Sequence, residues 1–294
     1  MAHFIKCTIC SSNFQPFLVK NGFTLEKCPT CGLIRTDLQD NYASFVKHYY
    51  QKGYFTGDRS RIAYANYEDD KPYIVGNMRK FLTFIQGYKP TGILLDIGCA
   101  LGFSTQLARQ YGYQAYGVDP SDYAVMKAKK LVGKTLIRKA KISDLRDKPE
   151  TYDVVTMFDV FEHLADPGAD LVKLNKMLKD DGIMIIATGD TSSLFARILG
   201  RRWTFYNPPQ HLYYFNKDTM TRLLRDKGFE PVMWSRIGKW LSLRYVLHLA
   251  RTGGESVFAE FLYRLVELLN IGKFPIYLPT FDNMVVIAKK KLRT

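Results

Sequence analysis

Long apolar runs and abundant cysteine are both missing from this sequence of 294 residues. No apolar stretch reaches the ~20 residues that a membrane-spanning helix requires, so the sequence predicts no transmembrane segment. Internal repeats and low-complexity tracts are also lacking. Only five cysteines are present, and four of them fall into one N-terminal pattern. The chain is therefore expected to be globular, with any cysteine-bound metal or disulfide confined to its N-terminal part.

Acidic residues are scarce relative to basic ones. The chain has 42 lysines and arginines against 28 aspartates and glutamates, which gives a formal net charge of +14. A basic surface suits nucleic acid, an anionic membrane or a phosphorylated substrate, but the basic residues are spread widely and do not select among these partners. The hydrophobic content of 47% supports a packed core, and the length suits one large domain with appendages.

The most informative stretch covers residues 93–109. Apolar residues predict a buried strand that contains Asp96, Gly98 and Gly102 open a turn, and a helical pattern follows at once. Strand, glycine turn and helix in this order are typical of the nucleotide-binding start of a doubly wound α/β sheet. The spacing of Gly98 and Gly102 departs from the dinucleotide fingerprint G-x-G-x-x-G, so a nicotinamide cofactor is disfavoured.

Acidic residues recur where the next predicted strands end. The strand at 115–118 ends in Asp119, Asp144 follows within 140–145, and the strand at 152–158 leads into Asp159. A fifth strand is predicted at 183–187, after a helix around 171–178 and a turn at 180–182. An acid at the tip of the second strand of such a sheet is placed to accept hydrogen bonds from ribose hydroxyls.

Together these features resemble the class I S-adenosylmethionine (SAM) dependent methyltransferases. The first motif of that family, D-x-G-x-G-x-G, is matched at 96–102 with one alanine in place of a glycine. The block D-V-F-E-H-L-A-D-P at 159–167 resembles one that is common in the small-molecule branch. The resemblance implies a Rossmann-like seven-stranded sheet, SAM as cofactor, a ribose contact from Asp119 and an adenine contact from Asp144. The cofactor-binding residues expected on this basis are Asp96, Gly98, Cys99, Ala100, Gly102, Asp119, Pro120, Asp144, Leu145, Phe158 and Asp159. For Cys99, simple packing in the turn is the favoured interpretation.

Methyl transfer needs a group that aligns the acceptor and removes its proton. His163 is the first candidate for this general base, since histidine titrates near neutral pH and this one follows the fourth strand. On a helical turn Asp159, Glu162 and His163 would share one face. That arrangement resembles the acidic group that holds a divalent metal in ubiquinone-pathway O-methyltransferases. Alternatively, Glu162 and His163 orient the backbone over the cofactor.

An aromatic segment at 203–215 supplies the other catalytic candidates. The H-L-Y-Y-F run that begins at His211 resembles a loop that lies against the active site in the same branch, so His211 and Tyr206 are candidates of second rank. Packing is the alternative for these aromatic residues. The N-P-P-Q sequence at 207–210 echoes a motif of nitrogen methyltransferases, but it follows the fifth strand rather than the fourth and is discounted.

The N-terminal cysteines form two C-x₂-C pairs separated by seventeen residues. This spacing matches a structural zinc ribbon with no open coordination position, and the predicted zinc ligands are Cys7, Cys10, Cys28 and Cys31. Two disulfides are the alternative, which is disfavoured because SAM is an intracellular metabolite and a cytoplasmic location is expected. A four-cysteine module ahead of a SAM domain resembles bacterial deoxysugar C-methyltransferases and surface-glycan enzymes. It also resembles a group of ribosomal RNA guanine methyltransferases.

Five segments are expected along the chain. They are a zinc ribbon (1–38), a tyrosine-rich helical linker over the SAM site (39–90), the methyltransferase core (91–238), a helical insertion (239–274) and a final strand with a basic tail (275–294). In the linker, Tyr54 and Tyr67 cover the cofactor or pack in the core. A strand is predicted at 229–237, an amphipathic helix at 258–269, and the final strand at 283–288. The insertion is expected to form a lid or a dimer face, and the alternative is peripheral contact with an anionic membrane.

The sequence thus predicts a SAM-dependent methyltransferase whose substrate is a small molecule, such as a nucleotide-sugar, a glycan or a lipid-linked intermediate. Carbon, oxygen and nitrogen acceptors and any oligomeric state remain open at this level. RNA methylation is the leading alternative because of the net charge and the zinc ribbon. A third alternative is a non-catalytic SAM-binding scaffold, which the intact set of acids and glycines disfavours.

Overall fold

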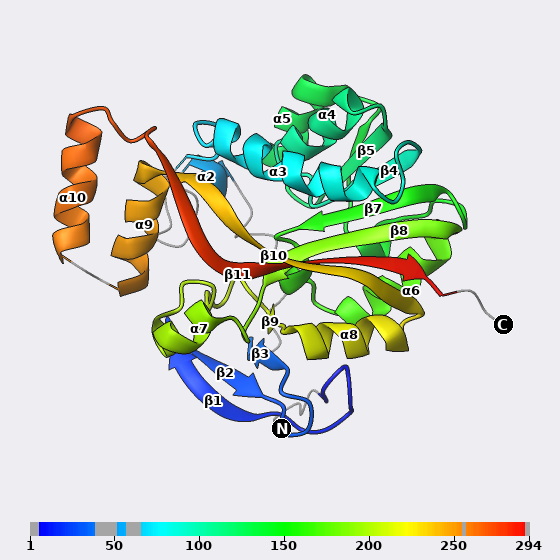
Figure 1. The fold of residues 1–294 in the computed structure, drawn as a ribbon, viewed down its shortest axis with the longest axis horizontal. Helices are drawn as coiled ribbons and strands as arrows, with labels where there is room; N and C mark the ends of the chain where they lie inside the picture. The colour runs from blue at the N-terminus through cyan, green and yellow to red at the C-terminus, as the bar shows by residue number, and fades with distance from the viewer. Residues whose placement is uncertain (1–5, 39–51, 57–65, 255–256, 292–294) are drawn as a thin grey trace.

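A twisted seven-stranded sheet forms the centre of the computed structural model, which describes residues 6–38, 52–56, 66–254 and 257–291 (Figure 1). The strand order is β10-β11-β8-β7-β4-β5-β6. The five parallel strands are β4 (Ile93–Ile97), β5 (Gln114–Asp119), β6 (Ile137–Lys139), β7 (Tyr152–Phe158) and β8 (Leu178–Gly189). β11 (Pro275–Lys290) runs antiparallel to β8, and β10 (Phe229–Ser242) runs antiparallel to β11. The predicted Rossmann-like α/β sheet of seven strands is confirmed.

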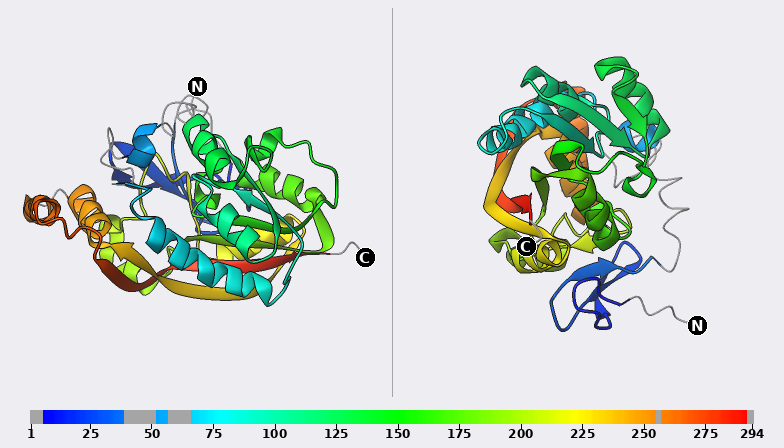
Figure 2. Two further views of the ribbon diagram at one scale, coloured as in Figure 1. Left: turned by 90° about the horizontal axis from the view of Figure 1, so that it is seen from above. Right: turned by 90° about the vertical axis from the view of Figure 1, so that its right-hand side faces the viewer.

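Helices cover both faces of this sheet (Figures 1 and 2). One face carries α3 (Lys71–Gln86), α4 (Phe103–Gln110) and α5 (Asp122–Val132), and the other carries α6 (Pro167–Met177) and α8 (Lys217–Asp226). Successive strand residues point to opposite faces. Leu94 therefore joins the core cluster of Phe81 in α3, whereas Leu95 joins that of Leu171 in α6. Two hydrophobic cores thus hold the sheet rigid from both sides.

Asp96 connects three elements beneath the ligand-binding edge of the sheet. It is buried in β4 and accepts hydrogen bonds from the hydroxyls of Thr105 in α4 (2.7 Å) and Thr156 in β7 (2.8 Å). Burial raises the pKa of Asp96 to about 6. Hydrogen bonds to a buried carboxyl offset its desolvation, so the motif acid stabilises the junction of strand, turn and helix.

The glycine turn after β4 is possible only without side chains at its two glycines. Gly98 has φ of +67° and Gly102 has φ of +85°. A Cβ on Gly98 would lie 2.4 Å from Val160 Cγ2, and one on Gly102 would lie 2.9 Å from Val132 Cγ2. The turn therefore depends on glycine both for its backbone conformation and for the close approach of neighbouring segments.

A second, smaller sheet contains the N-terminal residues and one distant segment. Its antiparallel order is β1 (Gln15–Lys20), β2 (Phe23–Lys27), β3 (Ile34–Thr36) and β9 (Tyr213–Tyr214). The segment at 211–215 was expected as a loop, but two of its residues pair with β3. The N-terminal module is thereby continuous with the loop that follows β8.

The C-terminal part differs from the prediction in its strand lengths. Strands were expected at 229–237 and 283–288, but β10 and β11 form a hairpin that stays paired as far as Ser242 and Pro275. The insertion between them consists of α9 (Leu243–Gly254) and α10 (Val257–Leu268), at the far end of the hairpin (Figure 1). β8 is also longer than predicted, because the 180–182 turn is part of it. The apolar pattern misses these extensions because their residues alternate between exposed and partly buried positions or include exposed acids.

The expected linker at 39–90 is described only in part. The described residues form the short helix α2 (Lys52–Thr56), a turn around Tyr67 and α3, whereas Tyr49, Tyr50 and Tyr64 lie outside the described residues. Within the described ranges no helix is both long and apolar enough to span a bilayer.

Replacement of Gly98 tests the turn. Gly98→Ala is expected to lower the free energy of unfolding by ~1–3 kcal/mol, because the new Cβ meets Val160 at an unfavourable φ. Gly112→Ala is the matched control, since Gly112 has φ of +92° and no atom within 4 Å of an added Cβ. The control loses only about 1 kcal/mol from backbone strain. Equal losses in chemical denaturation of the two variants would contradict the steric argument.

Candidate active site

A cavity of about 590 Å³ lies at the C-terminal edge of the parallel strands. This is the edge at which doubly wound sheets bind ligands. The expected site residues that line the cavity are Gly98, Ala100, Asp119, Pro120, Phe158, Asp159, Glu162, His163 and His211. Asp96, Cys99, Gly102, Asp144, Leu145 and Tyr206 do not line it. These residues come from the ends of three strands, β4, β5 and β7, and from the loop before β9, which supplies His211.

Asp119 is held by backbone amides at the end of β5. Its Oδ2 accepts the amide of Ala100 at 3.0 Å and its Oδ1 accepts the amide of Ser121 at 2.8 Å. Burial raises the pKa of Asp119 to about 6. A carboxylate has about four lone-pair sites, so two remain for ligand hydroxyls after these bonds. This end of the cavity also includes the 140–143 backbone, and it is named the cofactor end.

Two expected cofactor residues after β6 lie away from the cavity. Asp144 ends the short 3₁₀ helix η1 (Ile142–Asp144), and its carboxylate accepts the amide of Lys141 (3.1 Å) and the hydroxyl of Ser143 (3.3 Å). Leu145 is buried in the core. Asp144 therefore shapes the turn locally, and Lys141, Ile142 and Ser143 are the residues that reach the cavity.

Cys99 and Tyr206 also have packing environments. Cys99 is buried with Val125 and Ile137, and burial raises its pKa well above the ordinary value for a thiol. A thiol with a raised pKa is a poor nucleophile at neutral pH. Tyr206 lies in the core of the N-terminal sheet with Leu25 and Trp203. The packing alternatives weighed for both residues match these positions.

Asp159 is engaged by residues from the β10–β11 hairpin. Lys239 in β10 contacts both of its carboxylate oxygens at 2.9 and 3.0 Å, and the amide of Asn283 in β11 donates to it at 3.2 Å. Neither Lys239 nor Asn283 was expected as a site residue. Asn283 is the one polar side chain at the start of an otherwise apolar strand segment, which is a signal that the sequence does contain.

Two histidines face one another in the middle of the cavity wall. His163 ends the 3₁₀ helix η2 (Phe161–His163), and its ring centroid lies 4.9 Å from that of His211. His163 Nδ1 is 2.7 Å from the carbonyl oxygen of Gln210, and His211 Nδ1 is 2.7 Å from that of Phe205. Because a carbonyl can only accept, each Nδ1 carries a proton and each lone pair lies on Nε2. Burial lowers the pKa of both rings, so both are neutral at physiological pH.

Glu162 lies fully buried beside these rings. Its Oε2 accepts the hydroxyl of Thr188 at 2.8 Å, and its Oε1 finds no hydrogen-bond partner among the described residues. Burial, reinforced by the negative charge of Asp159, raises the pKa of Glu162 to about 8. The raised pKa favours the neutral form of this carboxyl, and Oε1 is its oxygen without a partner among the described residues.

The residues brought together as possible metal ligands differ from the predicted trio. Ligand atoms of Glu162, His163 and His211 lie within 4.8 Å of one another, whereas Asp159 is paired with Lys239. Backbone carbonyls that hold the second nitrogen of each imidazole are typical support for metal-bound histidine. The donor set is therefore compatible with a divalent cation as well as with proton transfer.

The opposite end of the cavity, named the acceptor end, is built largely by the hairpin and its helices. Trp240, Ser242, Tyr245 and Leu249 contribute to it. Asp70, at the start of α3, lies in the same wall. These residues are polar and aromatic, which suits a ligand with both a ring face and hydrogen-bonding groups.

The short helix α2 closes one side of the cavity. The hydroxyl of Tyr54 accepts a hydrogen bond of 2.8 Å from the Gln210 amide, and Gln210 Oε1 accepts one of 2.6 Å from Asn207. Tyr67 stacks on Phe103 with ring centroids 5.7 Å apart. Both tyrosines line the cavity, as the linker prediction requires for residues that cover a cofactor.

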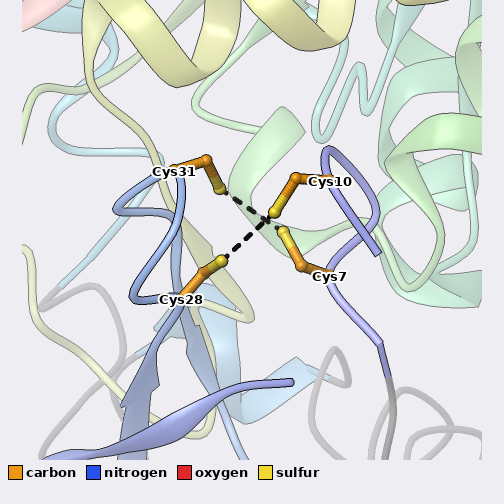
Figure 3. Close-up of side chains that lie close together, drawn as sticks. All are labelled: Cys7, Cys10, Cys28 and Cys31. Atoms are coloured by element: carbon orange, nitrogen blue, oxygen red, sulfur yellow. Dashed lines mark hydrogen bonds between the residues drawn. The ribbon is translucent and has the colours of Figure 1, made fainter. Parts of the chain in front are cut away.

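The four N-terminal cysteines converge at one point (Figure 3). The Sγ atoms of Cys7 and Cys31 are 3.5 Å apart and those of Cys10 and Cys28 are 3.4 Å apart. A disulfide would require about 2.05 Å, and all four cysteines are free thiols. A tetrahedron of Zn–S bonds of about 2.3 Å has edges of ~3.8 Å, close to the observed separations.

Comparison with known proteins extends this description. A family model described as "Methyltransferase domain" matches residues 72–233, which is more than half of the chain. A ubiquinone biosynthesis O-methyltransferase from Cereibacter sphaeroides is 29% identical over 175 residues, covering 52% of this chain and 71% of that protein. One from Bradyrhizobium diazoefficiens is 30% identical over 160 residues, covering 50% and 63%.

Solved structures share the fold at low identity. Magnesium protoporphyrin IX methyltransferase from Synechocystis PCC 6803, with bound SAH, is 16% identical with a TM-score of 0.53, covering 85% of this chain and 99% of that one. The 1,6-didemethyltoxoflavin-N1-methyltransferase from Burkholderia thailandensis is 14% identical with a TM-score of 0.53, covering 95% and 100%. With the glycine turn, the acid at the end of β5 and the cavity between them, the family match assigns this chain to the SAM-dependent methyltransferases.

Proposed function

We propose that the cavity binds SAM at its cofactor end and a hydroxyl-bearing small molecule at its acceptor end, with His163 as the general base. The observation that carries the proposal is the continuity of one cavity from Asp119 past His163 to the β10–β11 hairpin. Continuity matters because methyl transfer requires both reactants in line within one enclosure.

Asp119 is the proposed ribose ligand, with the backbone of the glycine turn beside it. Gly98 and Ala100 line the cavity without bulky side chains, so a ligand can approach their backbone closely. When bound there, SAM supplies a methyl group that its positive sulfur activates for displacement. The protein has then to align the acceptor oxygen and take up its proton.

His163 suits proton removal because of its tautomer and its neutral state. The bond from Nδ1 to the Gln210 carbonyl puts the lone pair on Nε2. As the acceptor oxygen forms its bond to the methyl carbon, Nε2 takes the hydroxyl proton and the ring becomes cationic. The nearby carboxylate of Asp159, which favours the charged form of His163, stabilises that cation.

The acceptor end favours a ligand rich in hydroxyl groups. Asp70 Oδ2, Asn283 Oδ1 and Glu162 Oε1 belong to residues that line the cavity, and all three atoms are buried without a hydrogen-bond partner among the described residues. A buried polar atom without a partner costs free energy, and a ligand that pairs with it recovers that cost. Hydroxyls both donate and accept, so a sugar of a nucleotide-sugar, a glycan or a lipid-linked intermediate fits these three positions.

We further propose that the four cysteines bind one structural zinc ion. The separations of the thiol sulfurs and the two knuckle turns fit tetrahedral coordination, and closed four-thiolate coordination leaves no site for substrate. The ion would hold β2 and β3 in place. β3 pairs with β9, which follows the loop that contributes His211 to the cavity.

The acceptor class is tested with methyl-tritiated SAM and an extract of the source organism. Label in a small-molecule or lipid fraction that survives nuclease treatment is expected. Label that nuclease digestion releases would instead establish RNA methylation. Asp119→Ala protein is the blank, because it keeps the acceptor end and loses the proposed ribose ligand.

The proposed ribose contact predicts a pH dependence of cofactor binding. Only the ionised carboxylate of Asp119 accepts both ribose hydroxyls, and its pKa is about 6. The affinity for S-adenosylhomocysteine should therefore be constant above that pH and fall by about tenfold per pH unit below it. Titration calorimetry measures this, and Asp119→Asn should bind weakly with a flat profile. An unchanged profile in Asp119→Asn would refute the role.

His163→Ala is expected to lower kcat by about 10²–10⁴-fold with the labelled acceptor fraction, because the proton acceptor is removed. Its affinity for S-adenosylhomocysteine should remain that of the wild type. Tyr206→Phe is the control, since Tyr206 lies in the N-terminal core and not in the cavity. Wild-type turnover by His163→Ala would exclude the general base.

Metal analysis is expected to give one zinc ion per chain. Cys28→Ser should lose the ion and unfold at lower temperature, whereas Cys99→Ser, the change at the fifth cysteine, should retain it. A second bound metal that disappears in His211→Ala would assign the Glu162, His163 and His211 cluster to a cation. That outcome would overturn the general-base role.

A further inference from the structure

α10 has an apolar stripe that points away from the rest of the protein. Phe258, Phe261, Leu265 and Leu268 follow one another at helical spacing and are 69, 60, 38 and 82% exposed. The opposite side of the helix faces α9 and includes the buried Ala259. Single exposed apolar residues are ordinary, but a contiguous stripe of large ones marks a surface for another apolar body.

Further apolar side chains lie exposed at this end of the molecule. Leu269, Ile271 and Phe274 follow α10 directly. The short helix α7 (Leu194–Leu199) adds Leu194 and Ile198, each 72% exposed. Figures 1 and 2 both show α7, α9 and α10 at the same end of the molecule, which is the left end in Figure 1 and in the left view of Figure 2. These residues and the α10 stripe together are named the docking end.

The charges of the docking end are unbalanced. Arg197 in α7 and Arg201 and Arg202 in the following 3₁₀ helix η3 (Gly200–Arg202) are exposed, and none of them forms an ion pair within the described chain. The two acids of α10 are already neutralised, because Glu260 pairs with Arg251 and Arg264 and Glu267 pairs with Arg244. Apolar side chains therefore lie beside cations that lack counter-charges.

We propose that the docking end binds the surface of an anionic lipid membrane. Large apolar side chains that enter the boundary between headgroups and acyl chains, flanked by basic side chains at the phosphates, are the features of peripheral membrane attachment. The strong positive net charge of +14 favours the same partner. A second copy of the chain fits less well, because the described residues of α7, α9 and α10 offer no unpaired carboxylate to the three arginines.

The docking end is also part of the cavity wall. α9 supplies Tyr245 and Leu249 to the wall, and Thr204 and Phe205 lie just after η3 in the sequence. Attachment through α10 and α7 therefore holds the acceptor end of the cavity close to the lipid headgroups. The proposed binding does not depend on which acceptor is methylated, so it stands or falls separately from the proposed function.

Co-sedimentation with vesicles tests the proposal on the full chain. The protein should sediment with vesicles of phosphatidylcholine containing about one third phosphatidylglycerol and remain largely in solution with phosphatidylcholine alone. Replacing all three arginines in Arg197→Gln/Arg201→Gln/Arg202→Gln should weaken binding by about a hundredfold, since each basic residue near an anionic surface contributes about fivefold. Phe258→Ser/Phe261→Ser should weaken it by about tenfold or more.

Matched variants separate the docking end from general charge and hydrophobicity. Lys130→Gln/Lys134→Gln/Lys176→Gln removes the same charge from exposed residues elsewhere, and Met126→Ser/Val172→Ser removes exposed apolar groups elsewhere. Both should bind vesicles like the wild type. Unchanged thermal unfolding and unchanged affinity for S-adenosylhomocysteine would show that all four variants are folded.

Two outcomes would overturn the proposal. One is a wild-type protein that stays in solution with anionic vesicles, or that binds them no more weakly after the docking-end changes than after the matched ones. The other is a dimer in light scattering that Phe258→Ser/Phe261→Ser dissociates, without vesicle binding by either form. That second result would assign the apolar stripe to a second copy of this chain.

Discussion

The backbone of Leu212 is the point at which the N-terminal module and the active site are joined. Its amide donates to the carbonyl of Glu162 at 2.8 Å, and its carbonyl accepts the amide of Thr36 at 2.8 Å. The hydroxyl of Thr36 also donates to the carbonyl of His211 at 2.6 Å. Leu212 thus holds the His211 segment next to Glu162, and Thr36 attaches this segment to β3. The precise facing of the two histidines depends on this junction, because the 203–212 loop has little regular structure of its own.

The cofactor half of the molecule could be predicted from the sequence because its signals are local. Asp96 and Asp119 lie near the ends of strands with a clear apolar pattern, the glycine turn follows the first of these strands, and the parallel topology brings such strand ends to one edge. For Asp144 the local signal is incomplete. Its carboxylate satisfies the amide of Lys141 in its own turn, which strand order alone does not reveal.

The acceptor half could not be predicted in the same way, because its contacts join residues far apart in the chain. Lys239 and Asn283 meet Asp159 only through the register of the β10–β11 hairpin, which continues well beyond the apolar part of each strand. β9 could not be predicted for a similar reason. Its two residues are too few for a periodic pattern, and its partner β3 lies far away in the sequence. A family resemblance pointed to His211 but not to its neighbour Gln210. The backbone carbonyl of Gln210 nevertheless sets the tautomer of His163.

The hairpin also has a consequence for how such an enzyme changes over time. β10 and β11 lie at one edge of the sheet. The cavity residues that they supply belong to one contiguous hairpin, which is paired as far as Ser242 and Pro275. An edge hairpin can be lengthened or exchanged without interrupting the parallel strands that hold the cofactor motifs. Recombination of this one segment can therefore change the residues of the acceptor end, while the strands that form the cofactor half stay the same.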